Sequence, residues 1–328
     1  MTSYLPVADR RLHPPLLWFA GAMAVFALVC VGGLVLDDRT LVGAPIWSKP
    51  LKFAVSFIAY ALSLAWMLSL LPPIARRAGR WAGSVVAVAG AVEMVLITLQ
   101  VVRGTRSHFN QATPFDATVF RIMGLTVVVL WVATLVVAVL LLRARMPDRA
   151  TAWAVRLSSF LALAGAAIGF LMVRPTPEQR AAENPPVVGA HGVGVPDGGP
   201  SMPVTGWATT GGDLRVAHFF GMHALQLLPL LLLLLTVLAP RFGRLADERI
   251  RLRLVVTAAG AYTAVFALLT WQALRGQPLL EPDGLTLATA GVIVLAAVAG
   301  SVLSLRSPAR SLPAPPTADP AGSARMRA

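Results

Sequence analysis

The sequence predicts an all-α protein that crosses a lipid bilayer eight times. Of its 328 residues, 56% are hydrophobic and only 13% are charged, whereas soluble proteins carry about 25% charged residues. Eight apolar runs also have the length of about 20 residues that a helix needs to cross about 30 Å of hydrocarbon. These runs lie at residues 15–36, 52–72, 82–102, 121–142, 154–173, 214–238, 254–274 and 284–305. They are too long, and alternate too little, to be strands of a membrane barrel.

The distribution of positive charge predicts how the helices are oriented. Of the 28 basic residues, 18 lie in the two chain ends and in the loops on the same side, and basic loops stay in the cytoplasm. We therefore expect a protein of the cell (plasma) membrane, with the N-terminal residues 1–14 and the tail at 306–328 both cytoplasmic. The tail is rich in Pro, Ala, Ser and Arg, which predicts disorder.

The same distribution argues against nucleic acid as a partner. The charge is spread over five short segments that flank helices, where it orients the chain and attracts anionic lipid. The partners we expect are the lipid bilayer and a small anionic or lipid-like ligand.

Two short similarities predict an internal repeat of four helices. Residues 96–104 read LITLQVVRG and residues 268–276 read LLTWQALRG, and residues 48–53 (SKPLKF) resemble residues 214–219 (LRVAHF). A four-helix unit keeps its orientation when it is repeated, so the two halves would be related by an axis along the membrane normal. We predict one repeat at 15–142 and a second at 143–305. The alternative is chance similarity between leucine-rich helices.

The outward loop at residues 174–213 is unusually long. Loops beyond about 12 to 15 residues are usually lids or disordered linkers. This one is rich in glycine, contains Trp207 and lacks the charge and serine repeats of a linker, so we expect an ordered cap over the outer end of the bundle.

Glu93 lies in the middle of an apolar run and is the first candidate for catalysis. An ionisable group at that depth costs about 2.5 to 3.5 kcal/mol, so it should face the interior of the bundle and act as an acid, a base or a proton relay. Gln100, seven residues later, shares its helix face and is a candidate ligand-binding residue. The structural alternative is a protonated Glu93 bonded to Tyr60, Ser63 or Tyr262.

Four of the five histidines map to the outer half of the bundle: His108, His191, His218 and His223. We predict catalytic or ligand roles for His108 and His218, and ligand binding for His223. His218 and His223 are five residues apart and cannot both face one ion on a helix, whereas His218 and Met222 can. The alternative is a neutral, hydrogen-bonded histidine at a helix end. The sequence names no cofactor and no metal.

Lysine occurs only at Lys49 and Lys52, at the start of the second helix, in a chain that otherwise uses arginine. A compact ammonium group there suits an anionic headgroup, a phosphate or a carboxylate. Pairing with Asp37 and Asp38, or snorkelling at the interface, are the alternatives.

The loop at 103–116 and the neighbouring helix ends hold an unusual density of donors and acceptors. With Lys49, Lys52, Gln100 and His223, the predicted ligand-binding residues are Arg103, Asn110, Asp116, Arg215, Gln272 and Arg275. We expect these side chains to form a polar chamber covered by the loop at 174–213. The alternative is that the arginines and aspartates pair with one another at the interface.

Three kinds of function fit these features. The first is a membrane enzyme or redox protein with an outward-facing ligand site; the second is a transporter of a small anionic or amphipathic molecule; the third is a sensor or assembly partner. The motifs GxxxxGK[ST], HExxH, CxxC and GxSxG are absent from the sequence, which weakens nucleotide-driven and zinc-hydrolase interpretations.

Three strings carry a resemblance to known proteins. GAPIWSKPLKF at 43–53, SHFNQATPFD at 107–116 and DLRVAHFFGMHALQLLPLL at 213–231 resemble an uncharacterised family of bacterial multi-pass membrane proteins, which implies an architecture but no activity. The four-plus-four repeat with outward histidines is also similar, more distantly, to haem A synthase. That family places haem-ligating histidines in both halves, whereas the second, fourth and eighth helices here contain none, which argues against bis-histidine haem ligation.

Overall fold

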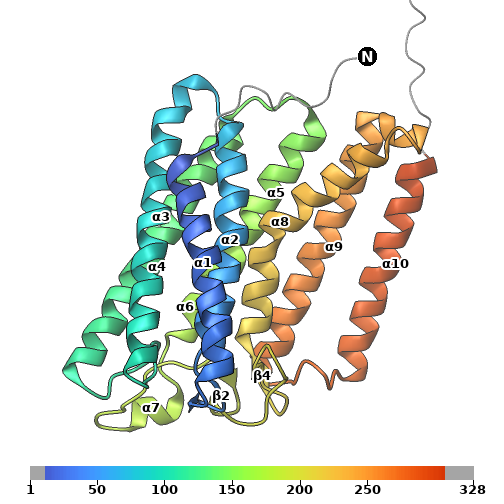
Figure 1. The fold of residues 1–328 in the computed structure, drawn as a ribbon. Helices are drawn as coiled ribbons and strands as arrows, with labels where there is room; N and C mark the ends of the chain where they lie inside the picture. Colours follow the sequence, from blue (N-terminus) through green and yellow to red (C-terminus); the bar gives the residue numbers. More distant parts are fainter. Residues whose placement is uncertain (1–11, 307–328) are drawn as a thin grey trace, which may run out of the picture.

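Eight long helices cross the molecule side by side in the computed structural model, which describes residues 12–306 (Figure 1). They are α1 (Pro14–Leu36), α2 (Ser48–Ser69), α3 (Pro73–Val102), α4 (Pro114–Arg143), α5 (Arg149–Ala167), α8 (Leu214–Leu238), α9 (Glu248–Leu274) and α10 (Gly284–Arg306). All eight, with α5 continued by two short helices, are long and apolar enough to span a membrane. The predicted class, an all-α polytopic membrane protein, is confirmed.

Several helices begin earlier than the apolar runs predict. α3 begins at Pro73 rather than residue 82, and α4 begins at Pro114 rather than residue 121. Proline suits the first turn of a helix, where a backbone N–H has no partner. The hydropathy pattern misses such turns because their polar and basic side chains lie at the membrane surface rather than in the hydrocarbon.

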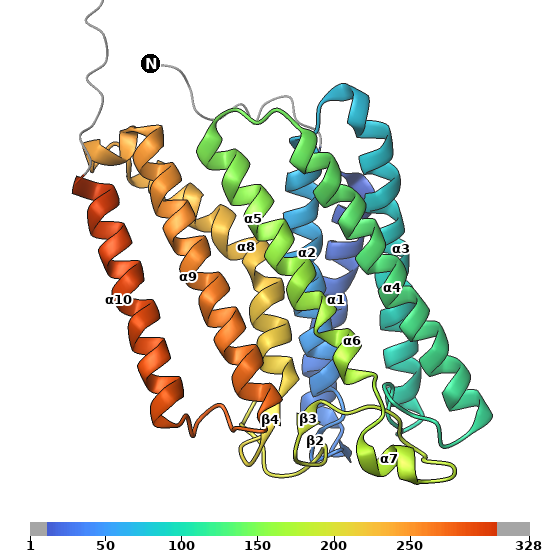
Figure 2. The same ribbon diagram turned by 180° about the vertical axis from the view of Figure 1, so that it is seen from behind.

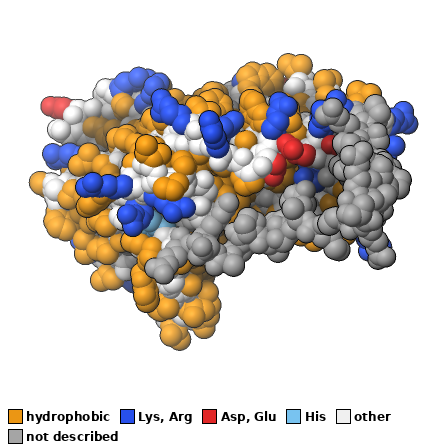
Figure 3. All heavy atoms as spheres, turned by 90° about the horizontal axis from the view of Figure 1, so that it is seen from above, with side chains coloured by type: hydrophobic (Ala, Val, Ile, Leu, Met, Phe, Trp, Pro, Cys, Tyr) orange, Lys and Arg blue, Asp and Glu red, His pale blue; other side chains and the backbone are white. Residues whose placement is uncertain are grey.

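The two ends of the bundle differ in their connections. One end, which we call the arginine-rich end, has short connections around residues 70–72, 144–148 and 239–247, the last containing the 3₁₀ helix η1 (Gly243–Ala246). Figure 3 views this end and shows basic side chains scattered over it. The predicted disordered tail lies outside the described residues, apart from Arg306 at the end of α10.

The opposite end, which we call the loop-rich end, holds the long connections and two small antiparallel pairings. Strand β1 (Thr40–Leu41) pairs with β2 (Ala44–Pro45), and β3 (Gly192–Val193) pairs with β4 (Gly212–Asp213). The segment at 174–213 also contains α7 (Pro177–Ala181) and a bridge from Val187 to Asn110. This segment therefore runs across the loop-rich end in defined contact with both halves.

The helices of the two halves have the same neighbours. α1 packs on α2 and α3, and α3 packs on α4; in the second half α5 packs on α8 and α9, and α9 packs on α10. The halves meet through α4 with α5 and α2 with α8 (Figures 1 and 2). This order supports the four-plus-four repeat, which stays a prediction.

A close backbone contact joins α5 and α8. A Cβ atom added to Gly165 would lie 2.5 Å from the carbonyl carbon of Gly221, so the two backbones touch. Small residues allow such contacts between membrane helices. Just beyond this contact α5 ends, and α6 (Gly169–Met172) continues the span after a break at Ile168. Irregular backbone in a membrane protein is tolerated where it lines a cavity.

Candidate functional site

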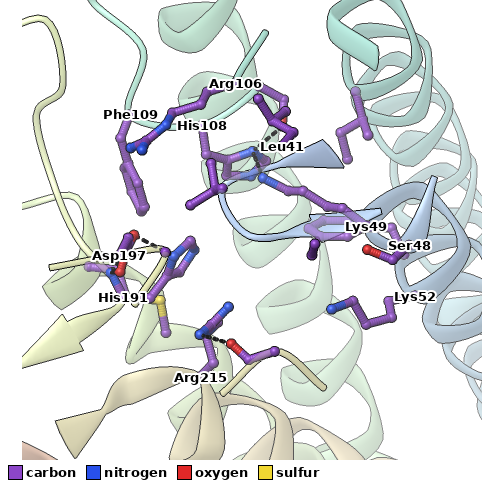
Figure 4. A pocket seen from close by; sticks show the side chains of 18 of the residues that line it. Leu41, Ser48, Lys49, Lys52, Arg106, His108, Phe109, His191, Asp197 and Arg215 are labelled. Carbon is purple, nitrogen blue, oxygen red and sulfur yellow. Dashed lines mark hydrogen bonds and ion pairs between the residues drawn. The ribbon is translucent and has the colours of Figure 1, made fainter. Parts of the chain in front are cut away.

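A cavity of about 490 Å³ lies at the loop-rich end between the two halves of the bundle. Its walls come from α2, α3 and α4 on one side and from α6 and α8 on the other, and residues 195–210 cover part of it. Its volume is within the range of about 300 to 1,000 Å³ that small-molecule sites occupy. Figure 4 shows that side chains from both halves point into the same space.

The ionisable side chains of the wall include six of the predicted site residues: Lys49, Lys52, Glu93, His108, Arg215 and His218. Arg106, His191 and Asp197 also line the cavity. The aligned strings SKPLKF and LRVAHF therefore begin the two helices, α2 and α8, that face each other across the cavity. In that alignment Lys49 corresponds to Arg215 and Lys52 corresponds to His218.

Glu93 is buried in α3 and contacts the cavity through His108. Its carboxylate accepts a hydrogen bond at Oε2 from the Thr126 hydroxyl (2.8 Å), whereas the buried Oε1 has no hydrogen-bond partner among residues 12–306. Oε1 lies 3.7 Å from Nε2 of His108. The structural alternative for Glu93, a hydrogen bond to Tyr60, Ser63 or Tyr262, is wrong. Those hydroxyls donate to or pair with atoms on other helices or on their own turn.

His108 links Glu93 to the mouth of the cavity. Its Nδ1 lies 3.0 Å from Lys49 Nζ and 3.1 Å from the Ser107 hydroxyl, both of which can donate to it. The proton of a neutral ring is then on Nε2, directed toward Glu93. Burial, the Lys49 ammonium and His191 hold the pKa of His108 well below its usual range. At neutral pH the ring is therefore uncharged, with its Nδ1 lone pair facing these two donors and its Nε2 proton facing Glu93.

His191 and Asp197 form a second imidazole–carboxylate pair on the loop that covers the cavity. Nδ1 of His191 donates to Asp197 Oδ2 (2.8 Å), and the Asp197 carboxylate also accepts from the backbone N–H groups of His191 and Gly192. Burial alone would raise the pKa of Asp197, but these hydrogen bonds lower it further than burial raises it. Burial lowers the pKa of His191 despite Asp197, so the ring is neutral and its Nε2 is an acceptor.

Phe109 separates the two imidazoles and has an unusual backbone. Its ring centroid lies 4.9 Å from that of His191 and 6.2 Å from that of His108. Its φ of 63° falls in the left-handed region, which is costly for a bulky residue and is common at functional sites. The bond from the Val188 N–H to the Phe109 carbonyl (2.9 Å) holds this conformation in place.

The cations at the mouth bind the covering loop. Arg215 donates to both carboxylate oxygens of Asp213 and to the Gly206 carbonyl (2.6 Å). Lys52 donates to the Thr205 carbonyl (3.0 Å). Among the described residues, neither lysine has a carboxylate within 4.0 Å of its ammonium. Lys49, Lys52 and Arg215 lie close enough to repel one another, and an anion between them would relieve that repulsion.

His218 is held at the helix break. Its Nδ1 donates to the Gly165 carbonyl (2.8 Å), so Nε2 is left as an acceptor in the cavity. The proposed partner Met222 does not line the cavity. Within residues 12–306, no group of three or more His, Cys, Asp and Glu side chains could hold a metal ion.

Several predicted ligand-binding residues of the first half lie outside the cavity, because they complete the ends of α3 and α4. Arg103 and Gln100 both bond to the buried Asp116 carboxylate, at 2.5 Å and 2.9 Å. Asn110 shapes its own loop through bonds to Thr105, to the Arg106 carbonyl and to the Ala112 N–H. The expected chamber is therefore smaller than the sequence suggested.

The corresponding residues of the second half are also outside the cavity. Gln272 donates to the Pro278 carbonyl, and Arg275 pairs with Asp283 at 3.0 Å. His223 lies on the exposed side of α8, 3.4 Å from Gln226. The alternative of arginine–aspartate pairing therefore describes Arg103 and Arg275 better than the chamber does.

The sequence reasoning did not select Asp197 or Thr126. The signal for Asp197 was a carboxylate six residues after a histidine in a glycine-rich loop, but only the folded loop shows that the two side chains meet. Thr126 is one threonine among many in apolar helices, and nothing in its spacing marks it as the partner of Glu93.

No protein-family model, no curated protein and no solved structure matches the chain. The resemblances to a bacterial membrane family and to haem A synthase therefore stay predictions.

Proposed function

We propose that this membrane protein binds a small amphipathic anion in the cavity at its loop-rich end. The observation that carries the proposal is the meeting of Lys49, Lys52 and Arg215 at the mouth of a cavity whose inner wall is apolar. The inner wall includes Ile97, Met123 and Phe170. A molecule with an anionic head and an apolar body matches both parts of the cavity.

The cavity also has the groups that acid–base chemistry on such a ligand would need. His108 and His191 are neutral imidazoles with a carboxylate beside each ring: Glu93 lies 3.7 Å from His108, and Asp197 accepts a hydrogen bond from His191. Imidazoles can accept and return protons, and an anion bound beside these rings would raise their pKa values toward the neutral range. We therefore favour a membrane enzyme with His108 and His191 as the acid–base pair and with the lysines as the anion site.

Binding of hexyl phosphate, measured by calorimetry on the protein in a neutral detergent, tests the anion site. We expect Lys52→Gln and Lys49→Gln each to weaken binding about tenfold, the effect of about 1.4 kcal/mol from one charge-assisted contact. Hexyl glucoside, which has the same chain without charge, should bind none of the three proteins measurably. Arg241→Gln at the arginine-rich end is the matched control. Equal affinity in all four proteins would refute the proposal.

Proton-coupled transport is the second candidate, because Glu93, His108 and Lys49 form a chain of proton-carrying groups from mid-helix to the mouth. Ionisable groups inside membrane bundles commonly serve proton relays. In proteoliposomes, hexyl phosphate uptake driven by a pH gradient should stop in Glu93→Gln if the protein is a transporter. An enzyme without transport would show no uptake in either form.

We also propose that the arginine-rich end faces the cytoplasm of a plasma membrane, as the charge distribution predicts. Cys30 is fully buried, so a cysteine introduced elsewhere can be labelled selectively. In intact cells a membrane-impermeant maleimide should label Val204→Cys, an exposed position at the loop-rich end, and not Arg241→Cys. The reverse pattern would overturn the orientation.

A further inference from the structure

The cavity continues from its polar mouth along one face of α4. Phe120, Met123, Gly124, Val127 and Val128 line it, at the spacing of a single helix face. Val128 is fourteen residues from the start of α4, a distance of about 20 Å along the helix axis. The cavity therefore reaches a depth that the hydrocarbon of a bilayer occupies.

The wall opposite this face is the break between α5 and α6, and it is also apolar. Ala166, Gly169, Phe170 and Val173 line the cavity there. Phe170 and Val173 are 37% and 44% exposed, and Val127 and Val128 are 41% and 42% exposed. Residues that line the cavity and are also this exposed mark a side opening between α4 and α6. Figure 2 shows the loop-rich ends of these two helices standing apart.

Trp131 closes the inner end of this opening. Its indole N–H donates to the Leu163 carbonyl of α5 (3.1 Å), and its ring meets Phe170 edge-on at 6.1 Å. α4 and α5 pack on each other, and this hydrogen bond is one of their contacts. The opening is therefore bounded on the inside by packed helices, at the mouth by cations, and at the side by hydrocarbon.

We propose that the anion bound here is a membrane lipid that enters sideways from the bilayer, and this inference rests on the proposed function. Its phosphate would lie at Lys49 and Lys52, and one acyl chain would fill the opening between α4 and α6. Water does not fill an apolar space at that depth, whereas a lipid chain does so without losing contact with hydrocarbon. The same geometry would admit the lipid without passing its chain through water.

Gly124 offers a way to close the opening without disturbing the protein. It lines the cavity, and a Cβ atom added to it meets no atom within 4 Å. Gly291 on α10 is a matched control, because a Cβ atom there also meets no atom within 4 Å and the residue does not line the cavity. Gly124→Trp should fill the opening, and Gly291→Trp should only add an indole to the lipid-facing surface.

The experiment uses phosphatidylglycerol with a photoreactive diazirine midway along one chain, bound to the full-length protein in detergent. We expect cross-links on Val127, Val128 and Phe170. Gly124→Trp should reduce them about tenfold, the effect of roughly two buried methylenes lost, and Gly291→Trp should leave them unchanged. Phosphatidylcholine with the same chain should label these residues weakly. Val127→Trp closes the same opening from an already exposed position and serves if Gly124→Trp does not fold.

Undiminished labelling in both closing variants would overturn the side entry, and so would equal labelling by phosphatidylcholine, which would indicate a general lipid contact. Neither result touches the proposed anion site, which hexyl phosphate and the lysine variants test from the aqueous side. If the lysine variants bind hexyl phosphate as the parent does, the proposed function fails instead. The two failures are therefore distinguishable.

Discussion

The third helices of the two halves, α3 and α9, end in the same way, but the functional side chains near these ends differ. Gly104 after α3 and Gly276 after α9 have φ values of 70° and 72°. In both halves the following N–H bonds back to the carbonyl of the aligned glutamine, Gln100 or Gln272, at 3.0 Å and 3.2 Å. Each half then pairs its arginine with an aspartate at the start of the next helix. The resemblance between LITLQVVRG and LLTWQALRG therefore records a shared helix end.

The residues of the proposed site lie where the two halves differ. Glu93 in α3 aligns with Val265 in α9, so only the first half carries a carboxylate at that level. The first half supplies His108 from a short loop, whereas His191 and Asp197 come from the long loop before α8. The starts of α2 and α8 face each other across one cavity, and the residues that the two halves do not share give the cavity its ionisable groups.

The largest effect should come from the contact that joins α5 to α8. Gly165→Val would push a side chain into the Gly221 backbone, where no atom can move aside cheaply. We expect a loss of about 3 kcal/mol or more, at the upper end for an overpacked site. Thermal unfolding in detergent measures it. Gly21→Val in α1, where a Cβ atom meets no atom within 4 Å, should be nearly neutral, and equal losses would refute the contact.

The next largest loss of stability should come from replacing the paired arginines, and the two replacements should differ in size. Arg103→Ala would leave the buried Asp116 carboxylate without its charged partner, at a cost of about 2 kcal/mol. Arg275→Ala removes the exposed pair with Asp283, and exposed pairs contribute little. In the same assay, Arg103→Ala should therefore have a clearly lower unfolding temperature than Arg275→Ala. The reverse ranking would show that the two pairs are not built as described.

The glycines after the two helices should behave alike. Gly104→Ala and Gly276→Ala each force a side chain into the left-handed region, at a cost of about 1 kcal/mol. The two unfolding temperatures should agree with each other. Gly32→Ala, inside α1 and open on all sides, should be neutral or slightly stabilising. A clear difference between the two cap variants would count against the repeat.

The pH dependence of stability should be the smallest effect. The pKa of His108 lies below its usual value because burial, Lys49 and His191 disfavour its proton. The unfolded chain therefore binds that proton more readily than the folded protein. This ring costs no stability above about pH 6.5, and the free energy of unfolding falls as the pH drops below that value. Between about pH 7.5 and pH 6 we expect less than about 1 kcal/mol from this ring.

Unfolding temperatures at these two pH values measure the effect in two variants. His108→Gln should make the profile shallower, because it removes one ring that the folded state keeps neutral, while His191 still contributes in the same direction. His223→Gln, at an exposed position on α8, should leave the profile unchanged. An unchanged profile in His108→Gln would contradict the placement of this ring among cations.

The sequence predicts the membrane class well because each span can be recognised from its own apolar composition, independently of the neighbouring helices. It also selects Lys49, Lys52, His218 and Glu93, because ionisable groups in apolar surroundings are rare, and all four line the cavity. The ends of the helices were harder. A first turn such as that of α3, with its arginines, looks like a loop in a hydropathy pattern although it is helical.

Selection between neighbouring polar residues fails for a different reason. Gln100, Arg103 and Asp116 look like an anion site in sequence, but their donors and acceptors satisfy one another at a helix end. Asp197 becomes part of the site only because the loop folds back over the bundle. Sequence spacing does not record either event, since both depend on contacts between distant segments.

The hydrogen bonds from Lys52 and Arg215 to the covering loop bear on how a ligand would enter the cavity. Lys52 and Arg215 already donate to the carbonyls of Thr205 and Gly206. The covering loop therefore uses some of the N–H donors that an anionic ligand would bind. A phosphate bound as proposed would compete with these carbonyls for the N–H donors, and each carbonyl that it displaced would release a turn whose tip, Val204, is exposed with a φ of 67°. Binding of the phosphate and release of this turn would then be coupled, and the covering loop would act as a competitor for the site.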